Sequence, residues 1–86
     1  MKTTNDGRNL YGADLSGMDL NSANLRDATL SCADLGRADL RRADLRGANL
    51  WGANLYGANL YLADLRGADL STRQREQVEK QGAILS

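Results

Sequence analysis

The sequence predicts an all-β solenoid, a chain wound into a stacked coil, and two observations predict it. Leucine recurs every five residues from Leu10 to Leu70, thirteen times without a gap. The residue two before each leucine is alanine, except that Arg8 precedes Leu10 and Met18 precedes Leu20. A period of five scatters these leucines around an α-helix, where five residues advance about 500°. In a flat strand it sends them to alternate faces. A coil with five-residue sides points every leucine inward.

Positions in each unit are counted from its leucine. Alternation along a short extended side places position −2 inside with the leucine and position −1 outside. Position −1 holds only Asp, Asn and one Thr, and glycine fills six of the thirteen +2 positions. Glycine suits a corner with positive φ. The other residues at +2, such as Arg42 and Leu62, predict that not every corner has this conformation.

The repeated motif resembles that of a known family. Three-residue runs such as Ala13-Asp14-Leu15 and Ala58-Asn59-Leu60 recur along the chain, with two residues between one run and the next. Over about residues 8–72 they resemble the A-(D/N)-L-x-x motif of pentapeptide-repeat proteins. The resemblance implies a right-handed quadrilateral β-helix with four pentapeptides per turn, and a bacterial, above all cyanobacterial, source. Residues twenty apart would then stack about 4.8 Å apart. The expected core consists of four leucine stacks: Leu10, Leu30, Leu50, Leu70; Leu15, Leu35, Leu55; Leu20, Leu40, Leu60; and Leu25, Leu45, Leu65.

Three segments are expected: a flexible N-terminal tail over 1–7, the β-helix over 8–72, and a helical cap and tail over 73–86. Ser71 and Gln74 have the spacing of a capping box, and Gly82 suits a helix stop. Ala83 and Leu85 fall on the five-residue register, which we interpret as coincidence rather than a vestigial repeat. The first turn has no comparable cap, so a weak homodimer through the coil ends is predicted.

Composition argues against most chemistry. The chain has 11 Lys+Arg, 11 Asp+Glu, no histidine and the single cysteine Cys32. Without histidine it lacks the usual acid–base residue and the commonest metal ligand. Stacked carboxylates such as Asp14 and Asp34 can raise each other's pKa, but they would lie on a convex surface. Leucine and alanine fill the interior, and no cofactor motif occurs. We therefore expect no catalytic, cofactor or metal site and no enzyme, and we interpret Cys32 as an incidental thiol.

The expected location is the cytoplasm. The sequence has no apolar run long enough to cross a bilayer. Its N-terminus, MKTTNDGRNL, lacks the apolar stretch of a signal peptide.

Exposed aromatic residues are the first candidate surface. Trp51, Tyr56 and Tyr61 occupy successive +1 positions, and Leu62 follows Tyr61. Tyr and Trp are enriched in protein interfaces. These side chains would face three adjacent sides, so the alternative is that each covers its own side of the coil.

Arginines form the second candidate surface. Arg37, Arg41 and Arg42 would make a basic corner for a polyanion. A separate stack of Arg26, Arg46 and Arg66 is interpreted as a ladder that Asp27, Asp44 and Asp64 neutralise.

The sequence favours a non-catalytic structural or protein-interaction module whose partner is another protein. The family resemblance suggests one alternative, a DNA-mimicking inhibitor of a topoisomerase such as gyrase. Proteins of that kind resemble longer, strongly acidic rods, whereas this chain is short and has a net charge of zero. The other alternative is weak polyanion binding through the basic corner, and nucleic acid is not an expected partner because the chain has no positive net charge.

Overall fold

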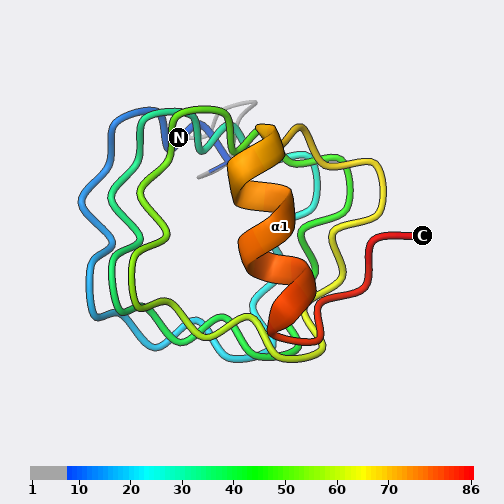
Figure 1. Cartoon of the computed structure of the whole chain (residues 1–86). Helices are drawn as coiled ribbons and strands as arrows, with labels where there is room; N and C mark the ends of the chain where they lie inside the picture. The colour runs from blue at the N-terminus through cyan, green and yellow to red at the C-terminus, as the bar shows by residue number, and fades with distance from the viewer. Residues whose placement is uncertain (1–7) are drawn as a thin grey trace.

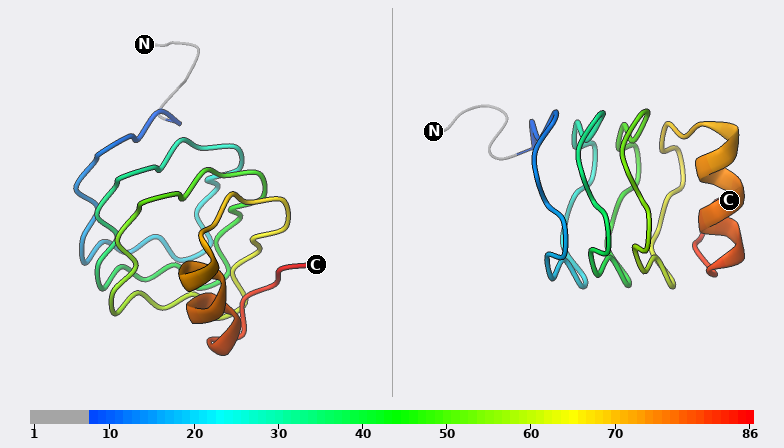
Figure 2. Two further views of the ribbon diagram at one scale, coloured as in Figure 1. Left: turned by 45° about the horizontal axis from the view of Figure 1, so that its top comes forward. Right: turned by 60° about the vertical axis from the view of Figure 1, so that its left-hand side comes forward.

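A computed structural model describes residues 8–86, and these form a coil closed at one end by a helix (Figures 1 and 2). Parallel bridges join residues twenty apart, so one turn of the coil contains four pentapeptides. Each bridge is a single pair of residues rather than part of a longer strand, because a turn follows every leucine. The bridged residues are those at position −1, as in the pairs Asp14–Asp34, Asp19–Asp39, Asn24–Asp44 and Thr29–Asn49.

The corners of the coil share one backbone conformation. The leucine carbonyl accepts a hydrogen bond from the N–H of the next −2 residue, as in Ala13 N to Leu10 O at 3.0 Å. Such a turn, with a left-handed second central residue, suits glycine. The prediction of mixed corners was wrong, because Arg42 and Leu62 have φ of 60° and 61°, and glycines such as Gly47 have φ of 72°. Each side stacks on the side twenty residues away, so the corners take the same backbone conformation. For a residue with a Cβ this left-handed conformation is less favourable by about 1–2 kcal/mol.

Hydrogen bonds from the corners explain why position −1 is Asp or Asn. Its side-chain oxygen accepts the N–H of the +1 residue, as in Ser16 N to Asp14 Oδ1 at 3.1 Å and Trp51 N to Asn49 Oδ1 at 3.0 Å. Asp and Asn favour such turns because their short side chains reach the backbone two residues ahead. Position −1 therefore has a structural role in most units; the exceptions are Thr29 and Asp69, the latter because Ser71 N donates to Gln74 Oε1 instead.

Leucine and alanine fill the interior as the sequence predicts. The leucines from Leu25 to Leu65 are buried, as are the alanines at −2 from Ala28 to Ala68. In the first turn Leu10, Leu15 and Leu20 are only partly buried, because none of the described residues covers that end. The expected tail over 1–7 lies outside the described residues. Met18, where other units have alanine, is 47% exposed.

Residues 8–86 contain one helix, α1 (Thr72–Lys80), which lies across the other end of the coil (Figures 1 and 2). It begins with the predicted capping box, in which Gln74 N donates to Ser71 Oγ at 3.1 Å and Ser71 N donates to Gln74 Oε1 at 2.8 Å. Val78 is fully buried against the coil. Within residues 8–86 no helix has the length and apolar character needed to cross a membrane.

The chain after α1 rejoins the coil, which corrects one prediction. We interpreted the register of Ala83 and Leu85 as coincidence, but Ile84 forms a parallel bridge with Asp64, twenty residues earlier. Ile84 N donates to Ala63 O at 2.8 Å, and Leu65 N donates to Ile84 O at 2.7 Å. Residues 81–85 thus behave as one more pentapeptide, and Gly82 has the positive φ of a corner, 90°. The bridge holds the segment in register because its backbone groups match those of the side beneath it.

Candidate functional site

The predicted aromatic surface surrounds the turn next to α1. Trp51, Tyr56, Tyr61 and Leu62 are 57%, 73%, 52% and 36% exposed. They stand on three successive sides, as expected, and do not form one flat patch. The ring of Tyr61 lies close to Gly82, where a Cβ would come within 3.2 Å of Tyr61 Cδ1. One of the aromatics therefore covers neighbouring backbone as well as facing outward.

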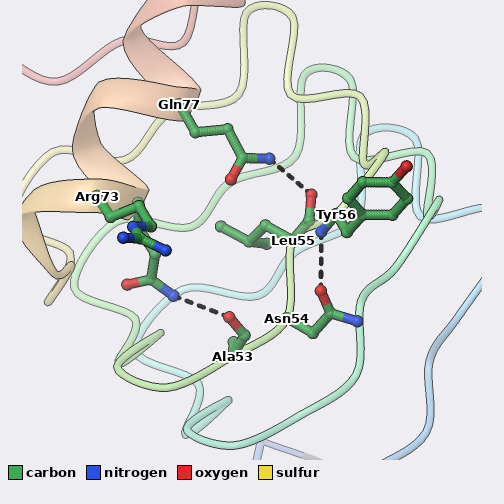
Figure 3. Close-up of a pocket in the computed structure, with 7 residues that line it drawn as sticks. Ala53, Asn54, Leu55, Tyr56, Arg73 and Gln77 are labelled. Atoms are coloured by element: carbon green, nitrogen blue, oxygen red, sulfur yellow. Dashed lines mark hydrogen bonds between the residues drawn. The ribbon is translucent and has the colours of Figure 1, made fainter.

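A pocket of about 370 Å³ opens between α1 and this turn (Figure 3). In Figure 3 Arg73 and Tyr56 lie on opposite margins, with Leu55 between them and Gln77 above. Its size falls in the range of small-ligand sites. This pocket was not predicted from the sequence. The available signal was Gln74 and Gln77, which lie three apart on one face of the helix. The lining residues are Ala53, Asn54, Leu55, Tyr56, Arg73, Gln74 and Gln77.

Glutamine side chains of the cap take the place of the next turn of the coil. The buried amide of Gln74 donates to Leu50 O at 2.6 Å and to Ala53 O at 3.0 Å. Gln77 donates to Leu55 O at 2.7 Å, and Gln81 Oε1 accepts from Leu60 N at 2.7 Å. A coil end exposes backbone groups that need partners. For Ala53 O and Leu60 N these glutamines supply the partners that a further strand would otherwise supply, and at Leu50 O and Leu55 O they add a second donor to the corner hydrogen bond.

The predicted basic corner is partly neutralised. Arg41 forms a two-point contact with Asp39, from Nε at 2.8 Å and Nη2 at 2.7 Å. This hydrogen bonding lowers the pKa of Asp39 to about 2. Arg37 and Arg42 are exposed at neighbouring +2 corners. One of the three guanidinium groups of the basic corner, that of Arg41, is therefore paired with a carboxylate on its own side of the coil.

Two members of the arginine ladder, Arg46 and Arg66, form ion pairs with Asp44 and Asp64, whereas Arg26 and Asp27 form none within residues 8–86. Arg46 Nη2 lies 2.8 Å from Asp44 Oδ2, and Arg46 Nε lies 3.8 Å from Asp64 Oδ2. Arg66 Nη2 lies 2.6 Å from Asp64 Oδ2. Hydrogen bonds from these arginines lower the pKa of Asp44 to about 2 and also lower that of Asp64. Carboxylates alternate with guanidinium groups, so this side has no continuous positive field.

Asp14 does not have the raised pKa that stacking on Asp34 could produce. The Ser16 hydroxyl, 2.7 Å from Asp14 Oδ1, lowers the pKa of Asp14 because this hydrogen bond favours the charged form. Asp34 accepts hydrogen bonds from Gly36 N at 2.9 Å and, from the next turn, Asn54 Nδ2 at 3.0 Å. Cys32 is exposed at a corner with φ of 61°. Among residues 8–86 no three Cys, Asp or Glu side chains are grouped so that they could hold a metal ion.

Comparison with known proteins identifies the family. The family model for pentapeptide repeats matches residues 9–47 and 33–71, with eight copies. A pentapeptide repeat protein, Rfr23, from the cyanobacterium Cyanothece 51142 is 33% identical with a TM-score of 0.64, and the match covers 91% of this chain and 57% of that one. HetL, a pentapeptide repeat protein involved in heterocyst differentiation regulation from the cyanobacterium Nostoc sp. strain PCC 7120, is 43% identical with a TM-score of 0.59. That match covers 88% of this chain and 33% of HetL.

The chain therefore spans about half the length of the first of these proteins and a third of the second. No curated protein matches it. Since the repeat model covers most of the chain and the coil has a turn of four five-residue units, the chain belongs to the pentapeptide-repeat family.

Proposed function

We propose that this protein is a non-catalytic structural module that acts by binding another protein. The observation that carries the proposal is the exposure of Trp51, Tyr56, Tyr61 and Leu62, between 36% and 73%, on the turn next to α1. Tyr and Trp supply much of the binding energy in protein interfaces. Leucine and alanine side chains fill the coil beneath them, which leaves binding to the outer surface and the ends.

The pattern of charges favours this proposal over its alternatives. A DNA mimic needs a strongly acidic face, whereas here Arg41, Arg46 and Arg66 are paired with aspartates on their own sides. A polyanion binder needs a positive field, and the chain has a net charge of zero. For the same module we infer a right-handed coil and a cytoplasmic location. The course of the chain in Figure 1, anticlockwise as it advances toward α1, supports the handedness.

Affinity capture with matched variants tests the proposal. The tagged protein would be incubated with lysate of the source cell beside the triple variant Trp51→Ser, Tyr56→Ser, Tyr61→Ser. The control is Tyr11→Ser, because Tyr11 is 65% exposed on the first turn. We expect one protein retained by the wild type and the control and lost by the triple variant. Circular dichroism would first establish that the triple variant is folded, and retention by all three proteins would reject this surface.

We further propose a weak homodimer through the first turn of the coil. Its Leu10, Leu15 and Leu20 are only partly buried and Met18 is 47% exposed. Burial of such apolar surface in a second copy is favourable by about 25 cal/mol per Å². Light scattering over a range of concentrations is expected to show a rising mass that Met18→Asp abolishes. A monomer at every concentration would exclude the dimer.

A further inference from the structure

At the end of the coil next to α1, residues 53–57 and 58–62 form no bridge with a further strand. Of these two sides, residues 58–62 have acceptors for their backbone donors, since Leu60 N donates to Gln81 Oε1 at 2.7 Å. On the first side Leu50 N donates to Asp69 O at 3.0 Å, and on the fourth Leu65 N donates to Ile84 O at 2.7 Å. On the third side, Leu62 N donates to Gly82 O at 3.2 Å. The second side, residues 53–57, has α1 above it instead. The bridges expected at residues 74 and 79 by the twenty-residue register are replaced by the helix.

The hydrogen bonds one turn earlier show which groups this leaves open. There Leu35 N donates to Asn54 O at 2.8 Å and Arg37 N donates to Tyr56 O at 2.7 Å. The equivalent donors on the open side are the N–H groups of Leu55 and Gly57. Within residues 8–86 neither N–H has an acceptor. Gly57 is exposed and Leu55 lines the pocket, so both N–H groups can donate to an acceptor from outside the chain.

The acceptors of the open side are already occupied. Gln74 donates to Ala53 O at 3.0 Å and Gln77 donates to Leu55 O at 2.7 Å. A peptide strand added here would also need acceptors for its own backbone N–H groups. The two glutamines already occupy the carbonyl oxygens that would accept from it. The open side therefore offers donors only. Its natural ligand is a group with acceptors only.

The positive charge of Arg73 favours a ligand with a negative charge. It lies on the margin of the pocket, is exposed, and forms no ion pair within the described part of the chain (Figure 3). A guanidinium group matches the two oxygens of a carboxylate. Backbone N–H groups beside a cation are a recurrent means of capturing a peptide C-terminus.

We propose that this pocket binds a carboxylate, which would accept hydrogen bonds from the backbone N–H of the lining residue Leu55 and from that of Gly57, which follows the lining residue Tyr56, and would face the Arg73 guanidinium. The group could belong to a small organic acid or to the C-terminus of a peptide, since the recognised chemistry is the same. This proposal goes beyond the protein-interaction function and does not depend on it. Of the aromatic surface, Tyr56 lines the pocket, whereas Trp51 and Tyr61 do not.

Nuclear magnetic resonance titration tests the proposal. The ¹⁵N-labelled protein would be titrated separately with acetate, with a short acetylated alanine peptide bearing a free C-terminus, and with the same peptide as its C-terminal amide. We expect saturable shifts of the Leu55 and Gly57 amide signals with a carboxylate and none with the amide. Tighter binding of the peptide acid identifies a peptide terminus as the ligand, and equal binding identifies a small acid.

Two variants make the test specific. Arg73→Gln is expected to weaken carboxylate binding at least tenfold, while Arg75→Gln leaves it unchanged, because Arg75 is an exposed arginine of α1 that does not line the pocket. An unchanged spectrum outside the pocket would show that both variants are folded. The proposal is overturned if Leu55 and Gly57 do not respond to either carboxylate. It is also overturned if the two variants bind equally.

Discussion

Replacement of Gln74 by alanine tests whether α1 is held to the coil by amide side chains. The Gln74 side chain is buried and makes three hydrogen bonds that alanine cannot make: to Leu50 O at 2.6 Å, to Ala53 O at 3.0 Å and from Ser71 N at 2.8 Å. Each contributes about 1 kcal/mol net, so we expect Gln74→Ala to lower the free energy of unfolding by about 3 kcal/mol. In a domain of this size that is a fall in Tm of roughly 12–24 °C.

Gln77→Ala is the matched control. Gln77 makes one such bond, to Leu55 O at 2.7 Å, so the expected loss is about 1 kcal/mol. Both changes replace glutamine with alanine in the same helix, which cancels the difference in helix propensity. Thermal unfolding followed by circular dichroism measures both. Equal losses for the two variants would refute the view that the buried amide of Gln74 anchors the cap.

Gln74→Glu adds a change in pH dependence. An ionised carboxylate at this position would face the carbonyl oxygens of Leu50 and Ala53, so the native state favours its protonated form and raises its pKa. Above the unfolded pKa of about 4.3 the native state then binds more protons than the unfolded state, and stability falls as pH rises. We expect the Tm of Gln74→Glu relative to wild type to fall between about pH 4 and pH 7. A constant difference over this range would contradict the placement of the amide.

Three further predictions follow from burial, backbone conformation and charge. Leu45→Ala should cost about 3–5 kcal/mol in urea unfolding, and Leu15→Ala distinctly less, because Leu45 is fully buried and Leu15 only partly; equal costs would contradict the packing. Gly47→Ala should lower the Tm more than Gly12→Ala does. Both glycines have positive φ, but of the two only Gly47 is placed so that a Cβ would overlap a carboxylate of the preceding turn, and equal Tm values would contradict this. The pKa of Asp44, about 2, lies below its ordinary value of 3.8, so the ionised Asp44 side chain stabilises the native state above about pH 4, and this stabilisation is lost as pH falls toward 2. Asp44→Asn should therefore reduce the fall of Tm with pH on the acid side, and an unchanged dependence of Tm on pH would argue against the ion pair.

The sequence predicts the repeated part of this fold well because every unit solves the same problem. A leucine at each fifth position and an alanine two before it specify the inward face, and the structure buries both between Leu25 and Ala68, while Leu70 is partly buried. The sequence also predicts the capping box of Ser71 and Gln74, since that motif is local. These features depend only on residues close together in the chain.

The parts that sequence reasoning missed depend on contacts between turns. Arg42 and Leu62 adopt positive φ because stacking imposes one corner shape, which outweighs their own preference. Ile84 joins the coil through Asp64, twenty residues away. The pocket beside Leu55 exists because a helix stands where a pentapeptide would have stacked. None of these follows from local propensity, since each requires the position of a distant side.

Native-state amide hydrogen exchange tests the central claim most directly, which is that twenty residues close each turn and that α1 leaves residues 53–57 without a strand to accept from Leu55 N. The Leu35 and Leu45 amides donate across turns at 2.8 Å, so they should exchange only through extensive unfolding. The Leu55 amide has the same position in its unit but no acceptor within residues 8–86, so in protein free of carboxylate it should exchange many times faster. Equal protection of Leu35, Leu45 and Leu55 would contradict the account.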